Sequence, residues 1–132
     1  MLVFVHGGGF VTGSGNWPQW DTAKIVELSI QAGQPIVAVG IKSVLYLSTP
    51  LFPDRLGTGI FLKDSHCLRN WYSYRIGLFG FLTSAAMRKS GYLPNNGLHD
   101  QKLAFRWIQK YISGFGGDPR NVTFLGSSIG AG

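Results

Sequence analysis

Cysteine and long apolar runs are both scarce in this sequence of 132 residues. The single cysteine, Cys67, excludes an internal disulfide and gives no information on the redox compartment. No stretch approaches the roughly 20 consecutive apolar residues of a membrane-spanning helix, so we expect no membrane span. Met1 leads into an apolar run without the basic start of a signal peptide. A longer parent protein could still be secreted, and the sequence determines neither the localisation nor the oligomeric state.

Acidic residues are also few: six Asp and Glu stand against twelve Lys and Arg, which gives a formal net charge of +6. A basic balance of this size raises the question of a nucleic-acid partner. Such a partner needs the cations gathered in a run or on one face, whereas here Arg88 and Lys89 form the only adjacent pair. We therefore expect no nucleic-acid partner.

The remaining composition is that of a globular domain, because 45% of the residues are hydrophobic and 14% are aromatic. The length fits one domain with one core, and we treat residues 1–132 as a single unit. The nineteen glycines fall largely into short clusters near the two ends of the chain. Clustered glycines mark unusual backbone conformations, so these are the places to look for a functional site.

The first part of the chain predicts a strand, a helix and a second strand. Leu2–Val5 is a short apolar run that stops at glycines, as in a strand buried on both faces. After a glycine-rich loop, Asp21 is a possible N-cap for a helix that would stop at Gly33. Ile36–Ile41 is rich in β-branched residues and predicts the second strand.

Near the other end, apolar residues at helical spacing predict the clearest helix of the chain: Ala104, Trp107, Ile108, Tyr111 and Ile112. Glycines end this helix, and a further apolar strand follows at 122–125. This alternation predicts the α/β class, with a mostly parallel sheet and flanking helices. Such sheets carry their chemistry in loops beyond the C-terminal ends of the strands.

The last predicted strand runs into Gly126-Ser127-Ser128-Ile129-Gly130, a G-x-S-x-G sequence. In a nucleophile elbow, this pattern holds the serine on a sharp strand-to-helix turn and exposes its hydroxyl above the sheet. A glycine-rich tail matches the five residues easily by chance. On the pattern alone, a nucleophile and an ordinary turn are about equally supported.

A second glycine motif, His6-Gly7-Gly8-Gly9-Phe10, follows the first strand. Such a loop can turn backbone N–H groups inward to bind a developing oxyanion. The alternatives are a flexible loop or a phosphate cradle. Thr12 stands where G-x-G-x-x-G needs its last glycine, and no Gly-Lys-Ser/Thr occurs, so the phosphate alternative is weak.

Taken together, the two motifs place the sequence beside a known family. Three blocks carry the resemblance: LVFVHGGGFVTGSG at 2–15, YRIGLFGFL at 74–82 and the long segment from Asn95 to Gly130. Over about three quarters of its length the chain resembles the type-B carboxylesterases and lipases, relatives of the cholinesterases with the α/β-hydrolase fold. The resemblance implies a carboxylic ester as substrate and no cofactor.

The resemblance also implies a role for particular residues. Ser128 would be the acylated nucleophile, with Gly8, Gly9 and the N–H of Ile129 forming the oxyanion hole. His6 would keep the shape of the loop and would not be the catalytic base. Three phenylalanines would line the substrate cleft, although core packing explains them equally well: Phe10, Phe79 and Phe81.

The triad acid and histidine of this family follow the elbow in the chain. The sequence stops at Gly132, so we expect it to be a fragment that lacks both groups and is inactive by itself. The alternative is a non-catalytic binding or adhesion module of the same fold. Such modules commonly lose the serine, and the presence of Ser128 favours the enzyme.

Three features depart from the family pattern. Ser127 and Ile129 stand where members usually carry glutamate and alanine, and the β-branched Ile129 narrows the acyl site. Residues 42–73 form an atypical insert without sustained periodicity. We hypothesise a translated intron there, with a genuine surface excursion as the alternative. His66 and Cys67 lie in the insert, and no other pair has metal-ligand spacing, so we expect no metal site.

Other charged residues are predicted to be structural. Arg75 and Asp100 are expected to form a buried pair, because charges inside proteins come paired. His99 precedes the serine in the chain, which is the wrong order for the base of this family.

Overall fold

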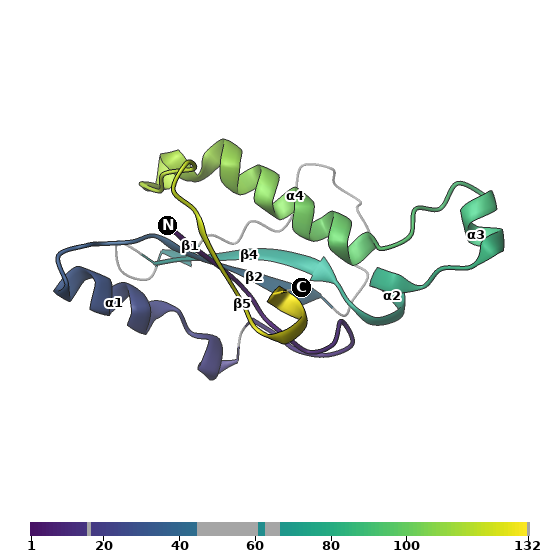
Figure 1. Cartoon of the computed structure of the whole chain (residues 1–132), viewed down its shortest axis with the longest axis horizontal. Helices are drawn as coiled ribbons and strands as arrows, with labels where there is room; N and C mark the ends of the chain where they lie inside the picture. The colour runs from purple at the N-terminus through teal and green to yellow at the C-terminus, as the bar shows by residue number, and fades with distance from the viewer. Residues whose placement is uncertain (16, 45–60, 63–66, 132) are drawn as a thin grey trace.

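The structure is a computed structural model that describes residues 1–15, 17–44, 61–62 and 67–131. Its centre is a five-stranded sheet in the order β3-β4-β2-β1-β5 (Figure 1). The strands are β1 (Leu2–Val5), β2 (Ala38–Val44), β3 (Phe61–Leu62), β4 (Cys67–Arg75) and β5 (Thr123–Gly126). All neighbouring pairs are parallel except β3 with β4. The predicted mostly parallel α/β sheet is confirmed.

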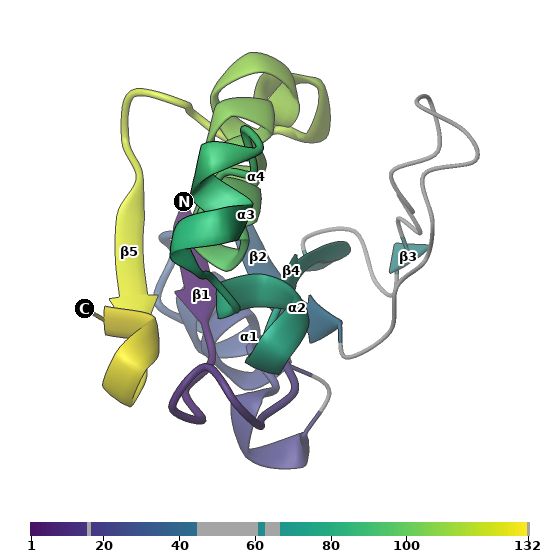
Figure 2. The same ribbon diagram turned by 90° about the vertical axis from the view of Figure 1, so that its right-hand side faces the viewer.

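Helices cover both faces of this sheet. The helices are α1 (Ala23–Gln31), α2 (Gly77–Phe81), α3 (Ala85–Lys89) and α4 (Asn96–Tyr111), with short 3-10 helices η1 (Pro18–Trp20), η2 (Ile112–Phe115) and η3 (Ser128–Ala131). In Figure 1, α1 and α4 lie on opposite sides of the strands. Figure 2 shows the same layers along the sheet, with α2 beside the loop that follows β1.

The residues of β1 alternate between two hydrophobic clusters. Val3 and Val5 pack with the face of α4 that carries Ile108, and Leu2 packs with Val26 of α1. Because β1 is covered on both sides, its sequence is apolar without interruption. Its place between β2 and β5, with helices on both faces, therefore explains the apolar run that predicted it.

The α4 helix confirms the periodicity seen in the sequence. Ala104, Ile108 and Ile112 are buried against the sheet, with exposed fractions of 3% or less. Trp107 is partly buried, whereas Tyr111 at the edge of the stripe is 45% exposed. The sequence therefore predicted correctly which side of α4 faces the sheet. The predicted apolar stripe is wider than the part of the helix that the sheet covers.

The covered face of α1 is narrower still. Val26 is its only buried residue, while Ile25 is 40% exposed and Leu28 is 51% exposed. The helix meets the sheet through a small cluster of Leu2, Val26 and Ala38, so much of its apolar surface stays accessible.

Parts of the predicted insert at 42–73 are regular structure. Residues 42–44 extend β2, Phe61–Leu62 form β3, and residues 67–73 belong to β4, which pairs with β2. The lack of periodicity therefore did not exclude strands, because the free edge of β2 offers backbone groups that another segment can pair with. Residues 45–60 and 63–66, which include His66, lie outside the described residues. The intron hypothesis stays a prediction.

Candidate active site

β1 and β5 lie side by side and end at the same edge of the sheet. Their register pairs Leu2 with Thr123 and Val5 with Gly126. One glycine motif begins at His6, the residue after β1, and the other at Gly126, the last residue of β5. Both turns therefore leave the sheet at one place (Figures 1 and 2). This is the carboxyl edge, where parallel α/β sheets carry their chemistry.

Ser128 is the first residue of η3 and lies at the sharp turn that follows β5. Its φ is 52°, a left-handed conformation that is unfavourable for a residue with a side chain. The side chain is exposed. Strain of this kind at an exposed serine is typical of a nucleophile elbow and is uncommon in an ordinary turn.

The two glycines of the elbow allow a close backbone approach. A Cβ on Gly126 would collide with the carbonyl oxygen of Gly130, and a Cβ on Gly130 would collide with that of Val5. The amide of Ser127 donates to the Val5 carbonyl at 3.1 Å, and the amide of Gly130 donates to the Ser127 carbonyl at 2.9 Å. The elbow is thus fixed to the end of β1, where the second motif begins.

The loop after β1 turns back through three residues with positive φ: Gly8 at 128°, Gly9 at 63° and Phe10 at 61°. The amides of Val11 and Thr12 both donate to the Gly8 carbonyl, at 3.1 and 3.0 Å. Among the described residues, the amides of Gly8 and Gly9 donate to no protein acceptor. These two N–H groups are the ones expected to bind an oxyanion.

Gly7 brings the loop against the elbow. A Cβ on Gly7 would lie 2.7 Å from the Ser127 carbonyl oxygen and 3.0 Å from the Cβ of Ser128. No side chain fits between the two turns, so glycine is required at this contact. The structure therefore brings together the two motifs that the sequence analysis paired.

The side chain of His6 hydrogen-bonds to the loop that follows β1. The side chain is fully buried, its Nδ1 donates to the Gly7 carbonyl at 2.7 Å, and its ring stacks on Tyr74 at 5.3 Å. The phenol of Tyr74 donates to the His6 carbonyl at 3.4 Å. Burial lowers the pKa of His6 below its ordinary value of 6.5, and the bond to Gly7 opposes that shift. A neutral ring engaged in this way holds the loop and is poorly placed to act as a base.

The three candidate cleft residues divide into a pair and a single residue. The rings of Phe10 and Phe81 stack with centroids 4.4 Å apart. Phe10 also packs against the main core cluster, so cleft lining and core packing do not exclude each other. Phe79 is 52% exposed on α2.

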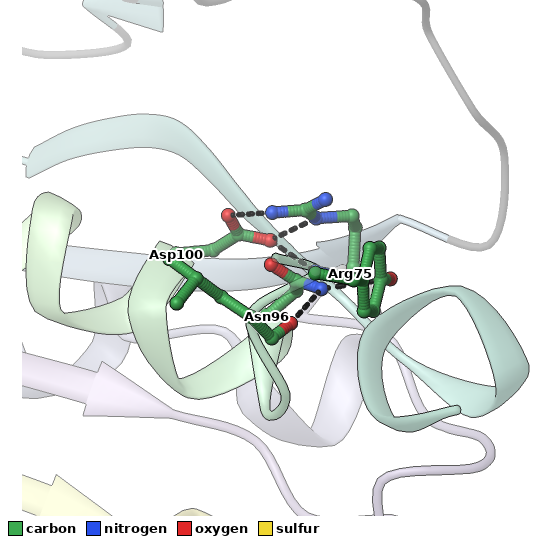
Figure 3. Close-up of polar contacts among 5 residues, drawn as sticks. Arg75, Asn96 and Asp100 are labelled. Atoms are coloured by element: carbon green, nitrogen blue, oxygen red, sulfur yellow. Dashed lines mark hydrogen bonds and ion pairs between the residues drawn. The ribbon is translucent and has the colours of Figure 1, made fainter. Parts of the chain in front are cut away.

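Arg75 and Asp100 form the predicted pair, although it is only partly buried (Figure 3). The Asp100 carboxylate accepts from Nε of Arg75 at 2.7 Å and from the second guanidinium nitrogen at 2.8 Å. It also accepts from the Arg75 backbone amide at 3.0 Å. His99, on the same helix, is exposed.

Sequence reasoning missed one hydrogen bond to the loop that follows β1. The amide of Gly77, at the start of α2, donates to the Phe10 carbonyl. The only sequence feature at this backbone contact is the glycine at position 77, whose φ of 61° favours glycine.

Neither a metal centre nor a membrane helix is found in the part of the chain that the structure describes. No three His, Cys, Asp or Glu side chains gather there as a metal site would require. None of the helices in that part has the length and apolar character needed to cross a bilayer.

Comparison with known proteins agrees with this geometry. Residues 70–132 match the carboxylesterase family, starting inside the segment that sequence analysis set aside as an insert. The chain is 32% identical over 130 residues to para-nitrobenzyl esterase of Bacillus subtilis, covering 98% of the chain and 19% of that esterase. It is 48% identical over 60 residues to carboxylesterase patB of Penicillium expansum, covering 46% of the chain and 11% of that protein.

A solved structure matches the fold as well. The crystal structure of Aspergillus niger EstA superposes with a TM-score of 0.62 at 25% identity, covering 98% of this chain and 18% of EstA. The sheet and its helices are thus part of an α/β-hydrolase fold. The chain belongs to the type-B carboxylesterase and lipase family, and it spans less than a fifth of the length of these three relatives.

Proposed function

We propose that this chain supplies the nucleophile and the oxyanion hole of a carboxylic ester hydrolase that works through an acyl-serine intermediate. The observation that carries the proposal is the contact between Gly7 and Ser128, with Ser128 exposed at a φ of 52°. This contact supports the proposal because it joins the loop that carries the Gly8 and Gly9 amides to the turn that carries a strained, exposed serine. Acyl transfer needs that combination.

In the proposed reaction, the Ser128 oxygen attacks the ester carbonyl carbon and its proton passes to a general base. The carbonyl oxygen becomes an oxyanion, which accepts hydrogen bonds from the amides of Gly8, Gly9 and Ile129. Collapse of the tetrahedral intermediate breaks the bond to the alcohol, which leaves with the proton. Water then attacks the acyl-serine by the same route and releases the acid. No cofactor takes part.

The base has to come from a residue other than the two described histidines. His6 is buried and bonded to the Gly7 carbonyl, and neither His6 nor His99 hydrogen-bonds to Ser128 among the described residues. A serine without a base is a weak nucleophile. We propose that the base and its acid partner are supplied by sequence beyond these 132 residues.

The Phe10 and Phe81 pair suggests the chemistry of the substrate. The two rings stack on each other, and Phe10 directly follows Gly9 in the chain, so we propose that they form an apolar wall near the oxyanion donors. We propose that an apolar acyl or alcohol group of the ester packs there. Ile129, which follows the serine, restricts the bulk that fits beside it.

The test is hydrolysis of p-nitrophenyl butyrate by the full-length product of the gene. Ser128→Ala should lower kcat/KM by at least about 10⁴-fold, as expected when a catalytic serine is removed. Ser127→Ala, which removes a hydroxyl one residue away, is the matched control and should stay within a few-fold of the parent. A folded full-length protein without esterase activity would instead favour the non-catalytic binding module.

A further inference from the structure

The conformation of the oxyanion loop depends on contacts made at Phe10. This residue has a φ of 61°, which costs free energy for a side chain of its size. Two ties from α2 hold it: the Gly77 amide donates to the Phe10 carbonyl, and Phe81 stacks on the Phe10 ring at 4.4 Å. Because Phe10 directly follows Gly9, these ties limit how the preceding amides turn.

The start of α2 is in turn fixed at Arg75. Asp100 of α4 accepts from both the backbone amide and the guanidinium of Arg75, at 2.7 to 3.0 Å (Figure 3). The Arg75 carbonyl lies where a Cβ on Gly80 or on Gly97 would collide with it. Asp100 thus holds residue 75 by its N–H and its side chain, and the backbones of Gly80 and Gly97 pack closely on its carbonyl, two residues before Gly77.

The second contact to Phe10, the stacking of Phe81, is also connected to α4. A Cβ on Gly97 would lie 2.5 Å from the ring of Phe81, so this ring sits directly on the first turn of α4. Asp100 stands one turn further along that helix. Both contacts to Phe10 therefore start from the region that the Arg75–Asp100 pair holds together.

We propose that Arg75 and Asp100 are positioning residues for the oxyanion hole. The pair sets the backbone of residues 75–77, the Gly77 amide then fixes the Phe10 carbonyl, and the Gly8 and Gly9 amides are aimed as a result. The catalytic half of this inference rests on the proposed function. The structural half, the coupling of Asp100 to the loop, does not.

A purely stabilising ion pair would have different consequences. The Arg75 side chain is 41% exposed, so solvent screens the pair and its contribution to global stability is small. Removing an ordinary pair of this kind would change the melting temperature slightly and leave the loop and kcat unchanged. A positioning pair changes the loop and kcat beyond its effect on global stability.

The structural half is tested by hydrogen exchange on the full-length protein. In Asp100→Asn, the amides of Val11, Thr12 and Gly77, which all donate within or to the loop, should exchange at least about tenfold faster. Asp118→Asn is the matched control, because Asp118 pairs with Arg120 at an exposed site away from the loop, and it should change none of these rates. Unchanged rates at all three amides in Asp100→Asn would overturn the inference.

The catalytic half is tested by kinetics on a p-nitrophenyl ester. Asp100→Asn and Arg75→Lys should each lower kcat on the order of 10-fold to 100-fold while KM changes little, because misaimed donors weaken binding of the oxyanion and not of the ester. Arg75→Lys keeps the charge but loses the two-point geometry, and it serves if Asp100→Asn does not fold. An unchanged kcat in a variant with faster loop exchange would overturn the catalytic half.

The two proposals fail in different ways. If the parent protein hydrolyses no ester, the proposed function fails while hydrogen exchange still decides the coupling. If the parent is active and the loop is unaffected by Asp100→Asn, only the positioning inference fails.

Discussion

The backbone of Gly7 lies directly against the side chain of Ser128, so that a Cβ on Gly7 would come within 3.0 Å of the Ser128 Cβ. These residues come from opposite ends of the chain and from the ends of two adjacent parallel strands. A serine in a left-handed turn and a loop with amides free to donate meet at this contact. The proposed ester hydrolysis depends on it.

The first prediction concerns this contact. Gly7→Ala would place a methyl group 2.7 Å from the Ser127 carbonyl, and backbone cannot yield there without moving the serine or the loop. We expect kcat of the full-length protein to fall on the order of 100-fold. Gly114→Ala is the matched control, because a Cβ there meets nothing within 4 Å, and it should leave kcat unchanged.

The second prediction concerns the strain at Ser128. A glycine adopts a φ of 52° without penalty, so Ser128→Gly should raise the free energy of unfolding by about 1 kcal/mol while abolishing hydrolysis. Ser127 has no positive φ, and Ser127→Gly should lower the stability instead. Chemical denaturation of both variants measures these changes in the free energy of unfolding. A Ser128→Gly variant less stable than the parent would contradict the claim that Ser128 is strained.

The third prediction is a pH dependence of stability caused by His6. Burial lowers its pKa in the folded state below 6.5, so the unfolded chain binds the proton more readily. The stabilisation is present above pH 6.5 and is lost as the pH falls toward the folded pKa. Melting temperatures measured between pH 8 and pH 5 should therefore fall on the acid side.

Two histidine variants separate this effect from general acid sensitivity. His6→Asn keeps a donor for the Gly7 carbonyl and should reduce the pH dependence, at the cost of some stability. His99→Gln changes an exposed histidine on α4 and should leave the dependence in place. Identical profiles for the parent and His6→Asn would show that His6 is not the cause.

The fourth prediction concerns the 132 residues alone. Because neither described histidine hydrogen-bonds to Ser128, we expect no turnover of p-nitrophenyl butyrate by this chain. Its edge strand β5 exposes Phe124 and Leu125 by 46% and 43%, so low solubility is also expected. Hydrolysis that depends on Ser128 in the isolated chain would contradict this prediction.

The sequence predicted the fold where local pattern and burial agree. The apolar run Leu2–Val5 and the periodic helix around Ile108 are confirmed, because each is covered by the sheet or its neighbours as the pattern requires. For α1 the pattern predicted the helix but not how little of its apolar face is buried, since only Val26 is buried in this helix. Periodicity reports which face is apolar and cannot report how much of it another element covers.

The site could be predicted as two motifs but not as an assembly. The glycine spacing predicted where the two turns lie, while the left-handed φ of Ser128 and Phe10 appears only in three dimensions. The bond from Gly77 to Phe10 joins backbone atoms distant in the chain, so no side-chain pattern encodes it. The pairing of β4 with β2 was missed for the same reason.

The most direct measurement is to treat the full-length protein with a fluorophosphonate and to locate the adduct by peptide mass spectrometry. We expect one covalent adduct on Ser128, none in Ser128→Ala, and normal labelling in Ser127→Ala. An active protein whose adduct forms on another serine, or whose Ser128→Ala variant still reacts and hydrolyses ester, would contradict it.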